Sequence, residues 1–127
     1  MDQGKEFSEY KLDNHLSQAL NSLGFERSTP IQDQAIPLVV SGQDVAGLAQ
    51  TGTGKTAAFL LPLIERVLRS QAPSGDEDID KRAFEDWKDN HFNLVLVPTR
   101  ELAEQVKDCA LDFLKGTDHR VVVVYGG

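Results

Sequence analysis

The sequence predicts an α/β fold in which helices cover a parallel sheet that is incomplete in this chain. Three short apolar runs, at residues 44–48, 92–97 and 120–125, have the length and composition of strands. The second and third, FNLVLV and RVVVVY, are almost continuously apolar, which is typical of strands that are buried on both faces. Segments with helical periodicity separate the runs, and this alternation indicates a parallel sheet with helices on both sides.

Two helices are expected before the first of these runs. Asp13 can cap a helix whose apolar residues recur at helical spacing, and Gly24 would end it. A second helix is expected from Pro30 to about Val39, with its end at Ser41-Gly42. The N-terminal part of the chain is therefore predicted to be helical.

The remaining elements follow the first run. A long apolar helix is expected at residues 57–70, and Pro62 inside it predicts a kink or a local break. Residues 74–90 are rich in acidic side chains and are interpreted as an exposed excursion, in which residues 83–87 form a short helix. An amphipathic helix is then expected at residues 100–115.

Composition limits the class of protein. The chain has 127 residues, enough for one domain, and 40% of them are hydrophobic and 26% charged. It has no apolar run that would span a bilayer and no secretory signal at its N-terminus, so no membrane partner is expected. The single cysteine, Cys109, excludes an internal disulfide, and its place on an apolar helical stripe predicts a core thiol in a reducing, cytoplasmic setting.

Two further features bear on completeness and on polyanion binding. The chain ends on Gly126-Gly127, directly after an expected strand, so we expect it to be the front part of a longer protein. Its formal net charge of -7 argues against bulk attraction to nucleic acid. Residues 75–91 hold seven acidic and three basic side chains, or -4 of that charge, so a polyanion site elsewhere would have to be local.

The strongest chemical signal is the octapeptide AQTGTGKT, which lies between an expected strand and an expected helix. It matches the phosphate-binding loop G-x-x-x-x-G-K-[ST], except that alanine replaces the first glycine. Glycines in such a loop let backbone N–H groups surround phosphate oxygens, the lysine reaches the β- and γ-phosphates, and the threonine hydroxyl ligates Mg²⁺. The predicted nucleotide-binding residues are Ala49, Gln50, Thr51, Gly52, Thr53, Gly54, Lys55 and Thr56, of which Lys55 and Thr56 are the catalytic candidates and Thr56 the metal ligand. The alternative is a glycine-rich turn without a ligand.

The stretch STPIQ, residues 28–32, has two interpretations. It can open a helix, with Thr29 as N-cap, Pro30 as first helical residue and Gln32 completing a capping box. Alternatively, the Gln32 carboxamide pairs with a group outside the chain. Local sequence alone favours the cap.

Four stretches together resemble one family. GFERSTPIQ (24–32), AQTGTGKT (49–56), PTRELA (98–103) and the terminal GG resemble, in that order, the Q motif, motif I, motif Ia and the GG element of DEAD-box RNA helicases. The resemblance implies a P-loop NTPase of the RecA-like three-layer fold, ATP and Mg²⁺ as cofactors, and RNA duplex unwinding or remodelling as the function. It also implies two segments: a helical segment with the Q motif at 1–43, and the first part of the ATP-binding domain at 44–127.

The resemblance also assigns residues to the base. It implies that Gln32 reads adenine, that Phe25 stacks on the base, and that Phe7 is the upstream aromatic residue of the same motif. A carboxamide offers a donor and an acceptor side by side, which match adenine N6 and N7. We therefore expect Gln32 to recognise adenine while the capping geometry serves as its scaffold.

RNA contacts are implied for motif Ia and the GG element, namely Pro98, Thr99, Arg100, Gly126 and Gly127. Contacts with the RNA backbone carry no base information, so specificity for strand geometry is expected. The alternative is that Arg100 and Glu101 form ordinary first-turn ion pairs. The specific RNA and any protein partners cannot be read from the sequence.

Several features receive no site role. Residues 76–78 (DED) resemble the acidic signature of the family but precede motif Ia and lack a strand before them, so we interpret them as loop. His15, His91 and His119 have no ligand spacing. Two rival functions remain at this point: a P-loop kinase or DNA motor, which has no reason to carry GFERSTPIQ with PTRELA, and a truncated binding module without enzymatic activity.

Overall fold

The computed structural model describes residues 4–50, 54–71 and 92–126, without the side chains of Ser70 and Gln71. The predicted acidic excursion with its short helix lies outside the described residues. So do four of the predicted site residues: Thr51, Gly52, Thr53 and Gly127.

The N-terminal helices form largely as predicted. α1 (Asn14–Ser22) begins after Asp13, whose Oδ1 accepts a hydrogen bond from the His15 amide at 2.9 Å. It ends before Gly24, which has a positive φ of 80°. α2 (Pro30–Val40) is also confirmed. The sequence did not predict the 3-10 helix η1 (Phe7–Tyr10) that precedes them.

α3 (Lys55–Gln71) follows the phosphate loop and is one continuous helix. The predicted local break at Pro62 is therefore wrong. Pro62 and its neighbour Leu61 are almost fully buried, because α3 packs against α2 on one side and α5 on another. This packing holds the helix together where the proline removes a backbone donor.

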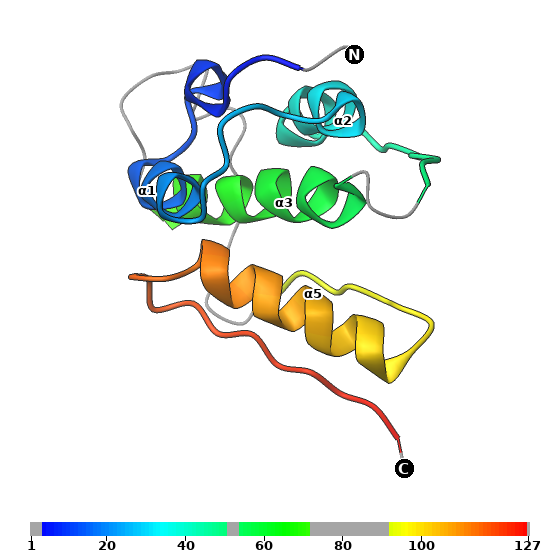
Figure 1. The fold of residues 1–127 in the computed structure, drawn as a ribbon. Coiled ribbons are helices and arrows are strands. Elements are labelled where there is room, and N and C mark those ends of the chain that lie inside the picture. Colours follow the sequence, from blue (N-terminus) through cyan, green and yellow to red (C-terminus); the bar gives the residue numbers. More distant parts are fainter. Residues whose placement is uncertain (1–3, 51–53, 72–91, 127) are drawn as a thin grey trace.

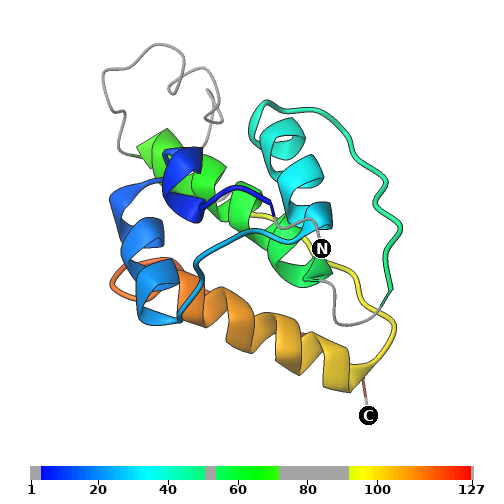
Figure 2. The ribbon, with the colours of Figure 1, turned by 45° about the horizontal axis from the view of Figure 1, so that its top comes forward.

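α5 (Arg100–Phe113) ends two residues before the predicted boundary, and Gly116 follows with a φ of 85°. α3 lies between α2 and α5 (Figure 1). Figure 2 shows α1 beside the C-terminal end of α5 and α3 beside α2. Phe113 of α5 is 1% exposed and belongs to the same hydrophobic core as Phe7, Tyr10 and Leu16 of the N-terminal segment.

The three predicted strands are extended segments. Within the described residues they form no ladder, and the β-pairing there is an isolated antiparallel bridge between Glu6 and Arg27. Val95, Val97 and Val121 pack against the helical core.

The opposite face of these segments is open. Its exposed side chains are Leu94 (72%), Leu96 (84%), Val122 (79%) and Val124 (87%). Among the described residues only one face is covered, so the predicted cover on both faces is not found there. Residues 92–97 and 120–125 keep the alternation of strands, whereas residues 44–48 are exposed throughout.

Candidate nucleotide and RNA site

The described part of the phosphate loop meets the Q motif at the N-terminus of α3. Gly54 has a φ of 86°, and a Cβ there would lie 2.4 Å from Gln32 Nε2 and 3.1 Å from Thr29 Oγ1. Only glycine fits this backbone and this space. Lys55 and Thr56 follow in the first turn, the former exposed and the latter half-buried.

Gln32 joins α2 to this loop and is itself only 4% exposed. Its Oε1 accepts a hydrogen bond from the Thr29 amide at 3.0 Å, so the capping-box interpretation is confirmed. Its Nε2 donates to the Gly54 carbonyl at 3.1 Å. A carboxamide has two hydrogens on nitrogen and two lone pairs on oxygen, so each end keeps one further hydrogen-bonding position.

Thr29 adds a polar atom to the same place. Its Oγ1 is buried and faces the Gln32 backbone amide in the capping box, but it makes no hydrogen bond of good geometry within the described structure. A buried hydroxyl without a partner is costly unless a ligand or water satisfies it. Thr29 Oγ1, Gln32 and Gly54 therefore form a small polar cradle beside the start of α3. Earlier in the loop, Ala49 is half-buried and Gln50 is exposed.

A buried polar network ties η1 to the Q motif. The Tyr10 hydroxyl donates to Asp33 Oδ1 at 2.8 Å and lies 2.9 Å from Ser28 Oγ. Burial raises the pKa of Tyr10 to about 12. Lys5 Nζ lies 4.3 Å from the centroid of the same ring. These contacts fix the segment before α1 against the start of α2.

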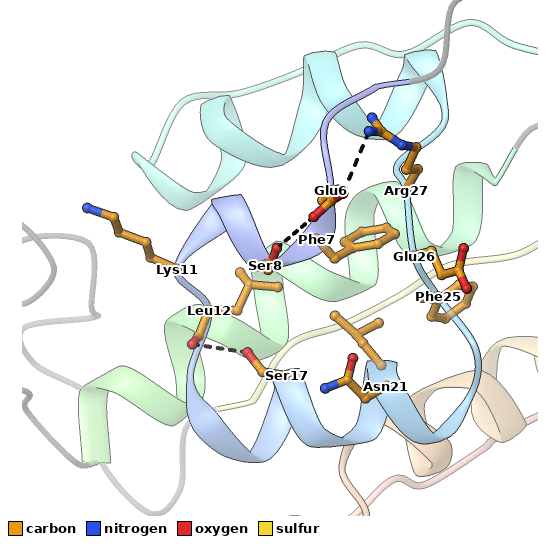
Figure 3. A pocket seen from close by; sticks show the side chains of 11 residues that line it. Glu6, Phe7, Ser8, Lys11, Leu12, Ser17, Asn21, Phe25, Glu26 and Arg27 are labelled. Carbon is orange, nitrogen blue, oxygen red and sulfur yellow. Dashed lines mark hydrogen bonds and ion pairs between the residues drawn. The ribbon is translucent and has the colours of Figure 1, made fainter.

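Phe25, which is predicted to stack on the base, lies next to Phe7, the predicted upstream aromatic residue of the Q motif. The ring centroids of Phe7 and Phe25 are 5.8 Å apart, and Phe25 is equally far from Phe113. Both rings line a cavity of about 480 Å³ between η1, α1 and residues 25–27 (Figure 3). Gln32 and Gly54 do not line this cavity. The structure thus unites Gln32 with the phosphate loop but places the two phenylalanines elsewhere.

Sequence reasoning missed a buried ion pair on α3. Glu65 is fully buried, and its two oxygens lie 3.0 and 2.8 Å from the Asp13 amide, which donates to them. Arg69 pairs with Glu65 and donates to the Lys11 carbonyl at 2.5 Å. Burial raises the pKa of Glu65, while the Asp13 amide and the Arg69 guanidinium oppose that rise.

This pair holds the turn between η1 and α1 against the helix that starts at the phosphate loop. Its signal in the sequence was two opposite charges four residues apart within an apolar helix.

The predicted RNA-contacting residues gather at the start of α5. Thr99 is its N-cap, and its Oγ1 accepts from the Leu102 amide at 3.1 Å. Arg100 donates to the Gly126 carbonyl at 2.5 Å, so motif Ia and the GG element meet across 26 positions. No described carboxylate pairs with Arg100, which disfavours the first-turn ion pair. Pro98, Thr99, Arg100 and Gly126 are all exposed.

The comparisons with known proteins agree with this arrangement. The model of the family "DEAD/DEAH box helicase" matches residues 29–127, and the chain belongs to this family. ATP-dependent RNA helicase CshA of Listeria monocytogenes is 42% identical over 122 residues, which are 95% of this chain and 20% of that protein. ATP-dependent RNA helicase RhlB of Shewanella piezotolerans is 40% identical over 97% of this chain and 26% of its own length. The chain thus spans about a quarter or less of these relatives.

Solved structures show the same fold. A DEAD box protein from Methanococcus jannaschii superposes with a TM-score of 0.76 at 32% identity, covering 99% of this chain and 30% of that one. The RNA helicase Prp28 of Chaetomium thermophilum, solved with ADP bound, gives 0.75 at 34% identity over the whole chain and 28% of its own. The predicted α/β, RecA-like P-loop class is confirmed as a partial domain. The family also rules out the kinase alternative.

No helix in residues 4–50, 54–71 and 92–126 is long and apolar enough to cross a membrane. The same ranges hold no group of three or more acidic, histidine or cysteine side chains able to bind a metal.

Proposed function

We propose that this chain is the nucleotide-binding front of an ATP-dependent RNA helicase, which couples ATP hydrolysis to unwinding or remodelling of RNA duplexes. The observation that carries the proposal is the Gln32–Gly54 hydrogen bond, which joins an amide suited to adenine to a loop suited to phosphate. The relatives named as ATP-dependent RNA helicases support the same function.

Lys55 and Thr56 are the proposed phosphate and Mg²⁺ residues. Both stand in the first turn of α3, where backbone amides and the helix dipole favour anions. The residues present fit such a group, because Gly54, with a φ of 86°, lets the loop backbone approach Gln32 and Thr29 closely just before the helix N-terminus. Lys55 would pair with the β- and γ-phosphates, and the Thr56 hydroxyl would ligate Mg²⁺. The ion, when bound, neutralises charge that develops on the phosphates.

Adenine recognition is assigned to Gln32. Its second Nε2 hydrogen and second Oε1 lone pair would pair with adenine N7 and N6 while the two internal hydrogen bonds hold the carboxamide plane. Guanine presents two acceptors on that edge and would leave Oε1 without a donor. Stacking of Phe25 on the base rests on the resemblance alone, because its ring contacts Phe7 and Phe113.

RNA would meet the start of α5. Arg100 contacts Gly126, Pro98 and Thr99 precede Arg100 in the chain, and Gly127 follows Gly126, so one strand's phosphates would reach a helix N-terminus and a guanidinium together. Such contacts read the backbone and not base order. We also propose the division into residues 1–43 and 44–127, and a cytoplasmic location.

The test is ATP hydrolysis by the complete protein that carries this chain, measured with and without single-stranded RNA. Lys55→Ala should abolish turnover and keep the wild-type melting temperature, because Lys55 is exposed and its charge would act on phosphate. Lys115→Ala removes the same charge from an exposed position after α5 and is the control, with unchanged turnover expected. Near-normal hydrolysis by Lys55→Ala would refute the proposed function.

A further inference from the structure

Arg100 is held at two points on the segment that precedes the GG element. Its guanidinium donates to the Gly126 carbonyl at 2.5 Å, and its central carbon lies 5.2 Å from the centroid of the Tyr125 ring. Arginine commonly stacks on an aromatic face in this way, with its N–H groups left free at the rim. The Gly126 carbonyl accepts from one side of the guanidinium, and the other N–H groups have no partner among the described residues.

Tyr125 is in turn fixed by α5. Its hydroxyl donates to Glu104 Oε1 at 2.9 Å, and Glu104 Oε2 pairs with Lys107 Nζ at 2.5 Å. The hydrogen bond to Glu104 raises the pKa of Tyr125, and Lys107 lowers that of Glu104. At neutral pH the phenol therefore stays a donor and the carboxylate an acceptor. Glu104, one turn into α5, therefore holds the Tyr125 ring against Arg100, the first residue of the same helix.

Holding the Arg100 side chain in place matters because a free arginine side chain has several rotatable bonds. Fixing such a side chain on a ligand costs conformational entropy. A ring that already holds the guanidinium removes part of this cost before RNA arrives. Tyr125 is half exposed and Arg100 is exposed, so a phosphate can approach the rim without displacing the ring.

We propose that Tyr125 is a positioning residue for RNA binding, which holds the Arg100 guanidinium for a backbone phosphate and is itself oriented by Glu104. The proposal rests on the proposed function, in which Arg100 contacts RNA. It assigns a role to the residue just before the GG element, and that role works through Arg100.

The experiment measures the affinity of the complete protein for a labelled oligo(U) RNA over a range of salt concentrations, with a non-hydrolysable ATP analogue and Mg²⁺ present. Arg100→Gln should weaken binding and reduce the slope of log affinity against log salt by about 0.7, the value for one phosphate contact on a single strand. Arg120→Gln removes an equal charge from an exposed position on the same segment and should leave the slope unchanged.

Tyr125 is then tested in two backgrounds. In the wild type, Tyr125→Leu should weaken RNA binding several-fold, and Tyr125→Phe, which keeps the ring, should weaken it less. In the Arg100→Gln background, Tyr125→Leu should have no further effect, because the residue it positions is gone. Melting temperatures are recorded for every variant. If Tyr125→Leu fails to fold, Tyr125→Phe and Glu104→Gln carry the same comparison.

The outcomes separate the two proposals. An unchanged affinity and slope for Arg100→Gln would overturn the RNA contact itself, and the positioning role with it. If Arg100→Gln weakens binding as expected, but Tyr125→Leu has equal effects in both backgrounds, Tyr125 contacts RNA directly. That result, or a silent Tyr125→Leu in the wild type, would overturn the positioning role alone.

Discussion

The Nε2 amide of Gln32 donates to the carbonyl oxygen of Gly54 at 3.1 Å, across 22 positions of the chain. The same side chain closes the capping box of α2 through Thr29. A single carboxamide therefore joins the first turn of α2 to the residue before α3. Any ligand that moves the phosphate loop must change the surroundings of Gln32, and any base that binds Gln32 is coupled to the loop.

Gly54→Ala tests the close approach at this junction. The new Cβ would lie 2.4 Å from Gln32 Nε2, so the loop or the glutamine must shift, and ATP affinity should fall at least tenfold. Gly116→Ala is the matched control, because Gly116 has nearly the same φ, 85°, but nothing within 4 Å of the added Cβ. Both variants should lose about 1 kcal/mol of stability from backbone strain, measured by denaturant unfolding. Equal ATP affinities for the two variants would contradict the account.

The buried pair on α3 predicts a large stability effect. Arg69→Met leaves Glu65 as a fully buried carboxyl without its cation and should lower the free energy of unfolding by about 3–5 kcal/mol. Lys107→Met breaks a partly exposed pair with Glu104 and should cost much less, because solvent screens the pair. Urea titrations of both variants provide the comparison. Similar losses would show that Glu65 and Arg69 contribute no more than a surface pair.

Tyr10 predicts a stability change at alkaline pH. Its phenol ionises near pH 10.0 in an unfolded chain, and burial raises that pKa to about 12 in the folded protein. Folding therefore favours the neutral phenol, and the associated stability is intact below pH 10 and is lost as the pH rises toward 12. The loss is on the order of 2 kcal/mol. In Tyr10→Phe this component should be absent, so the difference in unfolding free energy between the two proteins should shrink over that range. A constant difference would contradict the shift.

Local signals predicted the helices well. The Asp13 cap, the Gly24 stop and the capping box at Thr29 depend on neighbouring residues only, and all three are found. The break at Pro62 was predicted wrongly because burial against two other helices outweighs a local rule. The pattern of residues along the sequence does not show which helices pack against α3, so it could not predict that the helix stays continuous at Pro62.

The site was predictable in kind but not in its connections. The phosphate loop and the glutamine are recognisable from motif chemistry, whereas the Gln32–Gly54 contact joins positions far apart in the chain. Tyr10 and Glu65 were missed because each has its partners in distant segments. The stacking of Phe25 on a base stays a prediction, since the structure shows its ring packed against Phe7.

Adenine recognition by Gln32 can be separated from its structural role with two substitutions. Gln32→Ala removes the cap and both potential base contacts, whereas Gln32→Glu keeps the acceptor for the Thr29 amide and replaces the donor nitrogen with oxygen. The alanine variant should lose about 1 kcal/mol of stability. The glutamate variant keeps the cap but faces the Gly54 carbonyl with an acceptor, so its melting temperature shows how much that contact adds.

The most direct test of the account is the titration of wild type and Gln32→Ala with ATP and with GTP, each protein followed also by thermal melting. Loss of a matched donor and acceptor costs about 1–3 kcal/mol, so ATP affinity should fall roughly tenfold to a hundredfold while GTP affinity changes little. Equal losses for both nucleotides, together with a lowered melting temperature, would show that Gln32 only caps α2 and would contradict its role as the adenine reader.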